Sequence, residues 1–67
     1  MKEYVYVFDY STERILRITI DEKDKRQQLE EGIYDIDNIL RRRGLKETQC
    51  AYLFSEKVLE IENAELV

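Results

Sequence analysis

Two segments near the amino terminus have the apolar patterns of β-strands. Residues 4–10 (YVYVFDY) alternate aromatic and valine side chains, so both faces are apolar, which predicts an interior strand. Residues 15–20 (ILRITI) place isoleucine and leucine on one face, with Arg17 and Thr19 on the other. The intervening Ser11, Thr12 and Glu13 have turn character, so the two strands are predicted to form a hairpin.

A second hairpin is expected toward the carboxyl terminus. Residues 49–54 place Cys50, Tyr52 and Phe54 on one face of a third strand, with Ala51 and Leu53 on the other. Residues 55–57 have turn character, and residues 58–62 alternate as a short fourth strand with its apolar side chains inward. Residues 63–67 are expected to be a frayed tail.

The middle of the chain has the periodicity of a helix. Apolar side chains recur at spacings of three and four residues, at Leu29, Ile33, Ile36 and Leu40. Asp21 is a suitable N-cap with Asp24 as its capping-box partner, and Gly44 is a suitable residue to end the helix. One helix over residues 22–43 is favoured. Gly32 disfavours helix by about 1 kcal/mol relative to alanine, so a shorter helix over 36–43, capped by Asp35, is the alternative.

These elements predict an α+β fold of ββαββ type, with one helix packed on a four-stranded, mostly antiparallel sheet. The length of 67 residues leaves room for one small domain, residues 1–67. The pattern leaves open the order of the strands and the face that the helix covers.

The composition argues against catalysis. The chain has no histidine and two glycines, which excludes imidazole chemistry and a glycine-rich phosphate loop. We therefore expect no catalytic, cofactor-binding or metal-binding residues. Asp35, Asp37 and Asn38 faintly resemble part of a calcium loop but lack its glycine and its final glutamate, so a solvated helix face is expected. Cys50 lies in an apolar alternation and is expected to be a packed core cysteine.

The cysteine content and the amino-terminal sequence both favour a cytoplasmic location. One cysteine permits no intramolecular disulfide, which suits a reducing cytoplasm. The chain has neither a long apolar run nor the pattern of a signal peptide, so a cytoplasmic location is expected.

The net charge of −4 disfavours nucleic acid and anionic membranes as partners. Arg41, Arg42 and Arg43, with Lys46, are the concentrated basic feature. On one face of the first strand, Tyr4, Tyr6, Phe8 and Tyr10 could stack bases. We expect the arginines instead to complement the negative end of the helix dipole, so direct nucleic-acid binding is disfavoured.

Acidic residues gather in the closing segment, at Glu56, Glu60, Glu62 and Glu65. A rigid acidic surface can imitate a phosphate track and occupy the site of a DNA- or RNA-binding partner. An acidic inhibitor is therefore the alternative function, against a surface that only keeps the domain in solution.

One helix covers one face of a sheet, so apolar surface is expected to remain on the other. The predicted uncovered residues are Val5, Val7, Ala51 and Leu53, with Arg17 and Thr19 at the margin. Such a surface typically binds a protein partner or a second copy, and a homodimer formed through the sheet is expected. Val7→Lys should then abolish association and leave the fold intact, whereas loss of the fold would place these residues in the core.

The strand residues 4–12 (YVYVFDYST) and 49–54 (QCAYLF) resemble those of short, uncharacterised bacterial proteins. The resemblance covers about half of the chain and involves strand residues rather than site motifs. It implies a small bacterial accessory protein, with no residue roles to transfer.

Overall fold

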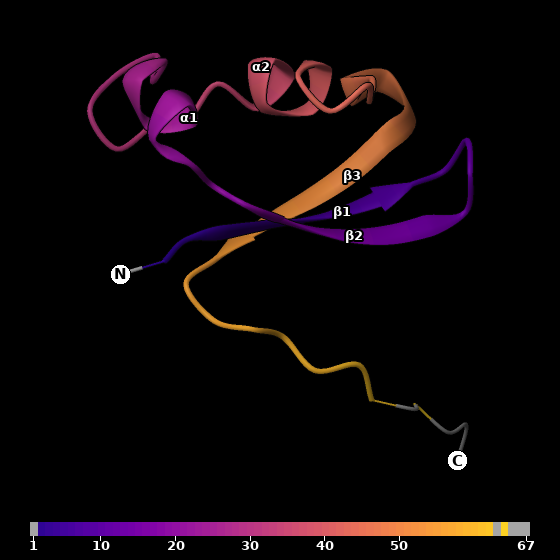
Figure 1. The fold of residues 1–67 in the computed structure, drawn as a ribbon. Coiled ribbons are helices and arrows are strands. Elements are labelled where there is room, and N and C mark those ends of the chain that lie inside the picture. Colours follow the sequence, from indigo (N-terminus) through magenta and orange to yellow (C-terminus); the bar gives the residue numbers. More distant parts are fainter. Residues whose placement is uncertain (1, 63, 65–67) are drawn as a thin grey trace.

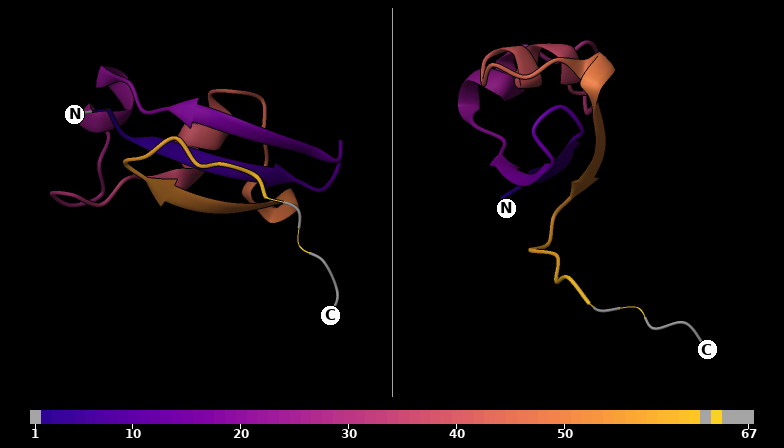
Figure 2. Two further views of the ribbon diagram at one scale, coloured as in Figure 1. Left: turned by 90° about the horizontal axis from the view of Figure 1, so that it is seen from below. Right: turned by 90° about the vertical axis from the view of Figure 1, so that its right-hand side faces the viewer.

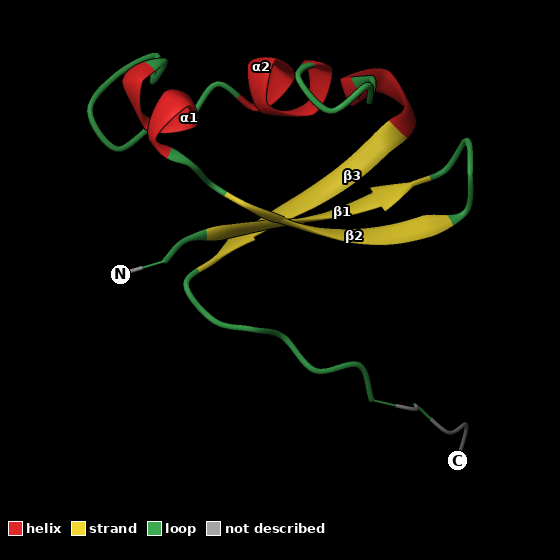
Figure 3. Cartoon of the chain, viewed as in Figure 1, coloured by secondary structure: helices red, strands yellow, loops and turns green. Residues whose placement is uncertain are grey.

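The computed structural model describes residues 2–62 and residue 64. A three-stranded antiparallel sheet in the order β2-β1-β3 forms one layer, and the helices form the other (Figures 1 and 3). The elements in chain order are β1 (Tyr4–Asp9), β2 (Arg14–Thr19), α1 (Glu22–Arg26), α2 (Ile36–Arg41), the 3-10 helix η1 (Glu47–Gln49) and β3 (Cys50–Ser55). The fold is still mixed α and β, but the predicted four-stranded sheet with one packed helix is wrong.

The central position of β1 agrees with its apolar residues on both faces. It pairs with β2 through Val5↔Ile18 and with β3 through Val5↔Phe54. Directly opposed residues share a face of an antiparallel sheet, so Val5 and Val7 lie on the same side as Ile18 and Phe54. The predicted interior strand and the predicted first hairpin are confirmed.

The hairpin turn is organised by a buried carboxylate at the end of β1. Asp9 accepts hydrogen bonds from the Ser11 amide at 3.0 Å, the Ser11 hydroxyl at 2.7 Å and the Thr12 hydroxyl at 2.6 Å. These bonds favour the charged carboxylate, and the Thr12 and Ser11 hydroxyls lower its pKa to about 2. Two of the predicted turn residues, Ser11 and Thr12, therefore stabilise the hairpin turn by donating hydrogen bonds to Asp9.

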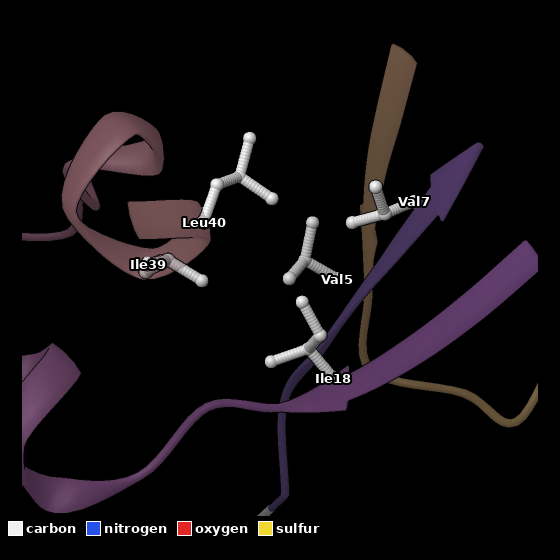
Figure 4. Close-up of a cluster of buried hydrophobic side chains, with 5 residues drawn as sticks. All are labelled: Val5, Val7, Ile18, Ile39 and Leu40. Carbon is white, nitrogen blue, oxygen red and sulfur yellow. The ribbon is translucent and has the colours of Figure 1, made fainter. Parts of the chain in front are cut away.

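The helices lie over one face of the sheet (Figure 1), and the valines of β1 are on that face. The core cluster joins Val5 and Val7 of β1 to Ile18 of β2 and to Ile39 and Leu40 of α2 (Figure 4). Both valines are 0% exposed. The expectation that Val5 and Val7 lie on the uncovered face is therefore wrong, because alternation places them beneath α2.

Two short helices replace the long helix predicted over residues 22–43. Gly32 has φ +81° within a turn closed by the Ile33 amide on the Glu30 carbonyl at 2.9 Å, a conformation that ends helical geometry. Asp35 then caps α2 by accepting from the Asn38 amide. The alternative of a shorter, Asp35-capped helix is the better description, and Leu29 of the predicted stripe is 67% exposed.

Both predicted ends of the helical region are confirmed. Asp21 and Asp24 form a reciprocal capping box at the start of α1. After α2, Gly44 has φ +75°, and the Leu45 amide donates to the Leu40 carbonyl at 2.9 Å. Together with the Gly44 amide on the Arg41 carbonyl at 3.1 Å, this is the Schellman arrangement that glycine permits.

Residues 58–62 do not form the predicted fourth strand. After β3 the chain turns beneath the sheet and runs across the face opposite the helices (Figure 2). The Tyr6 hydroxyl donates to the Lys57 carbonyl at 2.8 Å and accepts from the Leu59 amide at 2.8 Å. This side-chain tether draws the segment across the sheet instead of alongside an edge strand. The predicted frayed tail, 63–67, lies outside the described residues except for residue 64.

Candidate protein-interaction surfaces

The face of the sheet opposite the helices, here called the open face, carries side chains from all three strands. The pairing of Tyr6 with Arg17 and with Leu53 sets its register. The residues that share this face are Tyr4, Tyr6, Phe8, Ile15, Arg17, Thr19, Ala51, Leu53 and Ser55. Four of the six residues predicted for an interface lie here, namely Arg17, Thr19, Ala51 and Leu53.

An apolar groove of about 330 Å³ runs over the open face. Phe8, Ile15 and Leu53 line it from the three strands, and Leu59 and Ile61 line it from the carboxyl-terminal segment. Ile15 is 58% exposed and Leu53 is 53% exposed. The segment thus covers this face incompletely, and large apolar side chains remain in contact with water.

Charged groups at this groove have opposite signs. Arg17 and Glu60 both line it. The Arg17 guanidinium lies 5.5 Å from the centroid of the Tyr4 ring, which is the geometry of a cation–π contact. Neither Arg17 nor Glu60 forms an ion pair within residues 2–62.

A second groove, here called the aromatic groove, lies on the helix side of β3 and has a volume of about 560 Å³. Its walls include Tyr34, Tyr52 and Phe54. The Tyr34 and Phe54 rings stack with centroids 5.9 Å apart, and Tyr52 meets Phe54 edge-on at the same centroid distance. The rings therefore form one aromatic cluster that is open to water.

Two carboxylates also line the aromatic groove, those of Glu3 and Glu56. The Tyr34 hydroxyl donates to Glu3, and this bond raises the pKa of Tyr34 to about 12 because ionisation would bring a second negative charge beside the carboxylate. No lysine or arginine is among the groove's lining residues in the described part of the chain. The groove thus combines π faces with unbalanced negative charge.

The sequence pattern predicted the two aromatic residues that β3 contributes to this groove, but not Tyr34. Alternation in residues 49–54 places Tyr52 and Phe54 on one face, as the structure has them. The position of Tyr34 could not be predicted, because residues 29–40 were assigned to one continuous helix. In the structure the turn at Gly32 interrupts that helix and sets the position of Tyr34.

The three consecutive arginines are engaged with carboxylates. Arg42 lies 2.5 Å and Arg43 lies 3.0 Å from the oxygens of Asp24, whose side chain is completely buried. Arg42 also pairs with Asp21 and lowers the pKa of Asp21 well below its usual range. These four residues, the Arg–Asp cluster, join α1 to the end of α2. Arg41 pairs with the exposed Asp37 on its own helix.

The acidic residues of the closing segment do not share one surface. Glu56 lines the aromatic groove, and Glu60 lines the groove on the open face. Glu62 is exposed and is not among the residues lining either groove, and Glu65 lies outside the described residues.

Cys50 packs against the core cluster beside Asp9. Burial, with the nearby charge of Asp9, raises the pKa of the Cys50 thiol, which disfavours the reactive thiolate. Asp35 and Asp37 are accounted for as a helix cap and an ion-pair partner. Within residues 2–62 and 64, no group of three carboxylate or cysteine side chains is arranged to hold a metal ion.

No protein-family model matches the chain, and neither the curated proteins nor the solved structures contain a match to it. None of the helices formed by the described residues has the length and hydrophobicity needed to cross a lipid bilayer.

Proposed function

We propose that this protein is a small, non-enzymatic protein–protein interaction domain that self-associates through its open face. The supporting observation is the joint exposure of Phe8, Ile15 and Leu53 around one groove. Burying such side chains against a partner removes apolar surface from water, the main favourable contribution to most protein association.

A second copy of the chain suits this surface for two reasons. A two-fold interface brings a patch against its own copy, so an apolar centre meets an apolar centre. Arg17 and Glu60 line the same groove without an ion-pair partner among the described residues, and such an interface can bring each near its opposite on the other protomer. The proposed interface is therefore complementary in both hydrophobicity and charge.

The alternative of an acidic inhibitor has less support. It requires a continuous row of carboxylates, and Glu56 and Glu60 line different grooves. Binding of nucleic acid through the arginines is also less favoured, because Arg42 and Arg43 are neutralised within the Arg–Asp cluster.

Sedimentation equilibrium on three forms of the chain tests the proposal. We expect the native chain to be dimeric at high micromolar concentration and Leu53→Lys to be monomeric, because lysine would place a charge at the centre of the interface. Leu29→Lys is the matched control. Leu29 is similarly exposed but lies in the connection between α1 and α2, so this variant should dimerise as the native chain does.

Circular dichroism of each variant verifies that the fold is retained. A native chain that stays monomeric at high micromolar concentration would contradict the proposal. A folded Leu53→Lys variant that still dimerises would move the interface away from the open face.

A further inference from the structure

The outer edge of β3 adjoins the aromatic groove and is unpaired within the described sheet. The Tyr10 amide donates to the Gln49 carbonyl, so by antiparallel alternation Ala51 and Leu53 also bond to β1. The backbone groups of Tyr52 and Phe54 then point away from β1. No hydrogen bond within residues 2–62 uses them.

An added strand would place its side chains over the aromatic groove. Strand addition extends the alternation of the sheet, so every second side chain of a segment paired with β3 lies on the helix side, beside Tyr52 and Phe54. That position faces the stacked ring of Tyr34 and the carboxylates of Glu3 and Glu56.

The chemistry of the groove selects a cation. Aromatic faces attract ammonium and guanidinium groups, and a carboxylate beside the rings adds to this attraction. The groove has both features, and its lining residues include no basic side chain. A lysine or arginine satisfies this site better than an apolar side chain of the same length, which would leave the carboxylates without compensation.

We propose that β3 and the aromatic groove bind an extended segment of another protein, which pairs with the β3 edge and places a lysine or arginine side chain among Tyr34, Tyr52 and Phe54. This site is separate from the open face and does not depend on self-association. If both proposals hold, a dimer presents two such sites, and a partner with two basic segments binds more tightly than its single segments do.

Titration of the isotope-labelled full chain with two peptides, followed by NMR, tests the proposal. The probe is a blocked heptapeptide of alternating threonine and valine with a central lysine, and the control peptide has norleucine in place of lysine. We expect the amide shifts to concentrate in β3 and in residues 32–36. The norleucine peptide should bind about three- to fivefold more weakly, because it lacks the cation.

Variants of the chain separate the charge from the rings. Glu56→Gln should weaken the lysine peptide about two- to threefold, whereas Glu60→Gln makes the same charge change at the other groove and should leave its affinity unchanged. Phe54→Leu keeps an apolar side chain but removes one π face, and should weaken the lysine peptide more than the norleucine peptide.

Three results would overturn the proposal: equal affinity for both peptides, shifts centred on β2 and residues 57–61 instead of β3, or no shifts at millimolar peptide. Ile15→Lys adds a charge to the open face on β2, away from β3, so this variant should be monomeric and should retain the native affinity for the lysine peptide. Its peptide binding and the dimerisation of the native chain are thus read independently, so either proposal can fail alone.

Discussion

Both faces of the sheet carry apolar side chains, but helices cover one face and an extended segment of the chain covers the other. On one face α1 and α2 are joined by the Arg–Asp cluster, and Val5 and Val7 beneath them are fully buried. On the open face, residues 57–61 cross the sheet, held by two hydrogen bonds to the Tyr6 hydroxyl. Apolar content alone therefore does not decide burial. The two helices bury Val5 and Val7 completely, whereas the single extended segment leaves Ile15 and Leu53 more than half exposed, so the extent of the covering element matters.

The largest contrast is expected from lysine placed on each face. Val7→Lys should destabilise the chain by about 4 kcal/mol or more and unfold it, because Val7 is fully buried and a lysine there has no partner. Leu53→Lys should change the stability of the protomer by no more than about 1 kcal/mol, because the lysine side chain can reach water. Urea unfolding followed by circular dichroism measures both. Similar losses of stability would show that the two faces are equally buried.

The Arg–Asp cluster gives the next contrast, between a buried and an exposed acid–arginine pair. Asp24→Ala should destabilise the fold by about 2–3 kcal/mol, because it leaves Arg42 and Arg43 without their shared carboxylate. Asp37→Ala removes the carboxylate that pairs with Arg41 at the surface and should cost less than about 1 kcal/mol. Thermal unfolding of the two variants compares them. If Asp24→Ala lowered the free energy of unfolding no more than Asp37→Ala does, the Arg–Asp cluster would not be what holds the two helices together.

The tether on the open face should have a smaller effect. Tyr6→Phe removes one hydroxyl that serves both Lys57 and Leu59 and should cost about 1 kcal/mol. Its local effect should be clearer, as faster hydrogen exchange at the Leu59 amide. Tyr10→Phe removes the hydroxyl of an exposed tyrosine that follows β1 and is the matched control. Unchanged exchange at Leu59 would mean that the segment is held by its apolar contacts.

The sequence supports prediction where one residue type determines local geometry. Asp21 with Asp24 forecasts the start of α1, Gly44 forecasts the end of the helical region, and the two apolar faces of residues 4–10 forecast a central strand. In each case the signal lies within a few residues of the feature that it specifies.

Features that depend on distant contacts were not predictable. β1 is apolar on both sides, so its pattern is consistent with helices on either face, and Val5 and Val7 were assigned to the wrong one. The spacing of residues 29–40 fits a helix although Gly32 adopts a turn. Residues 58–62 alternate like a strand, but the hydroxyl of Tyr6, about fifty residues earlier, determines their path. Candidate sites built from such features inherit these errors. Alternation within each strand correctly put Arg17 with Thr19 and Ala51 with Leu53, but it could not show that Val5 and Val7 lie on the other face.

Asp9 provides the smallest and most specific test, because it is a charged residue on the covered side of β1. Its pKa falls from 3.8 to about 2 through the Thr12 and Ser11 hydrogen bonds, so its contribution to stability is complete above about pH 4 and is lost as the pH falls through about 2. The difference in free energy of unfolding between the native chain and Asp9→Asn should therefore shrink across this interval. A difference for Asp9→Asn that stays constant from about pH 5 to pH 2 would mean that the hairpin turn does not depend on the charge of this carboxylate.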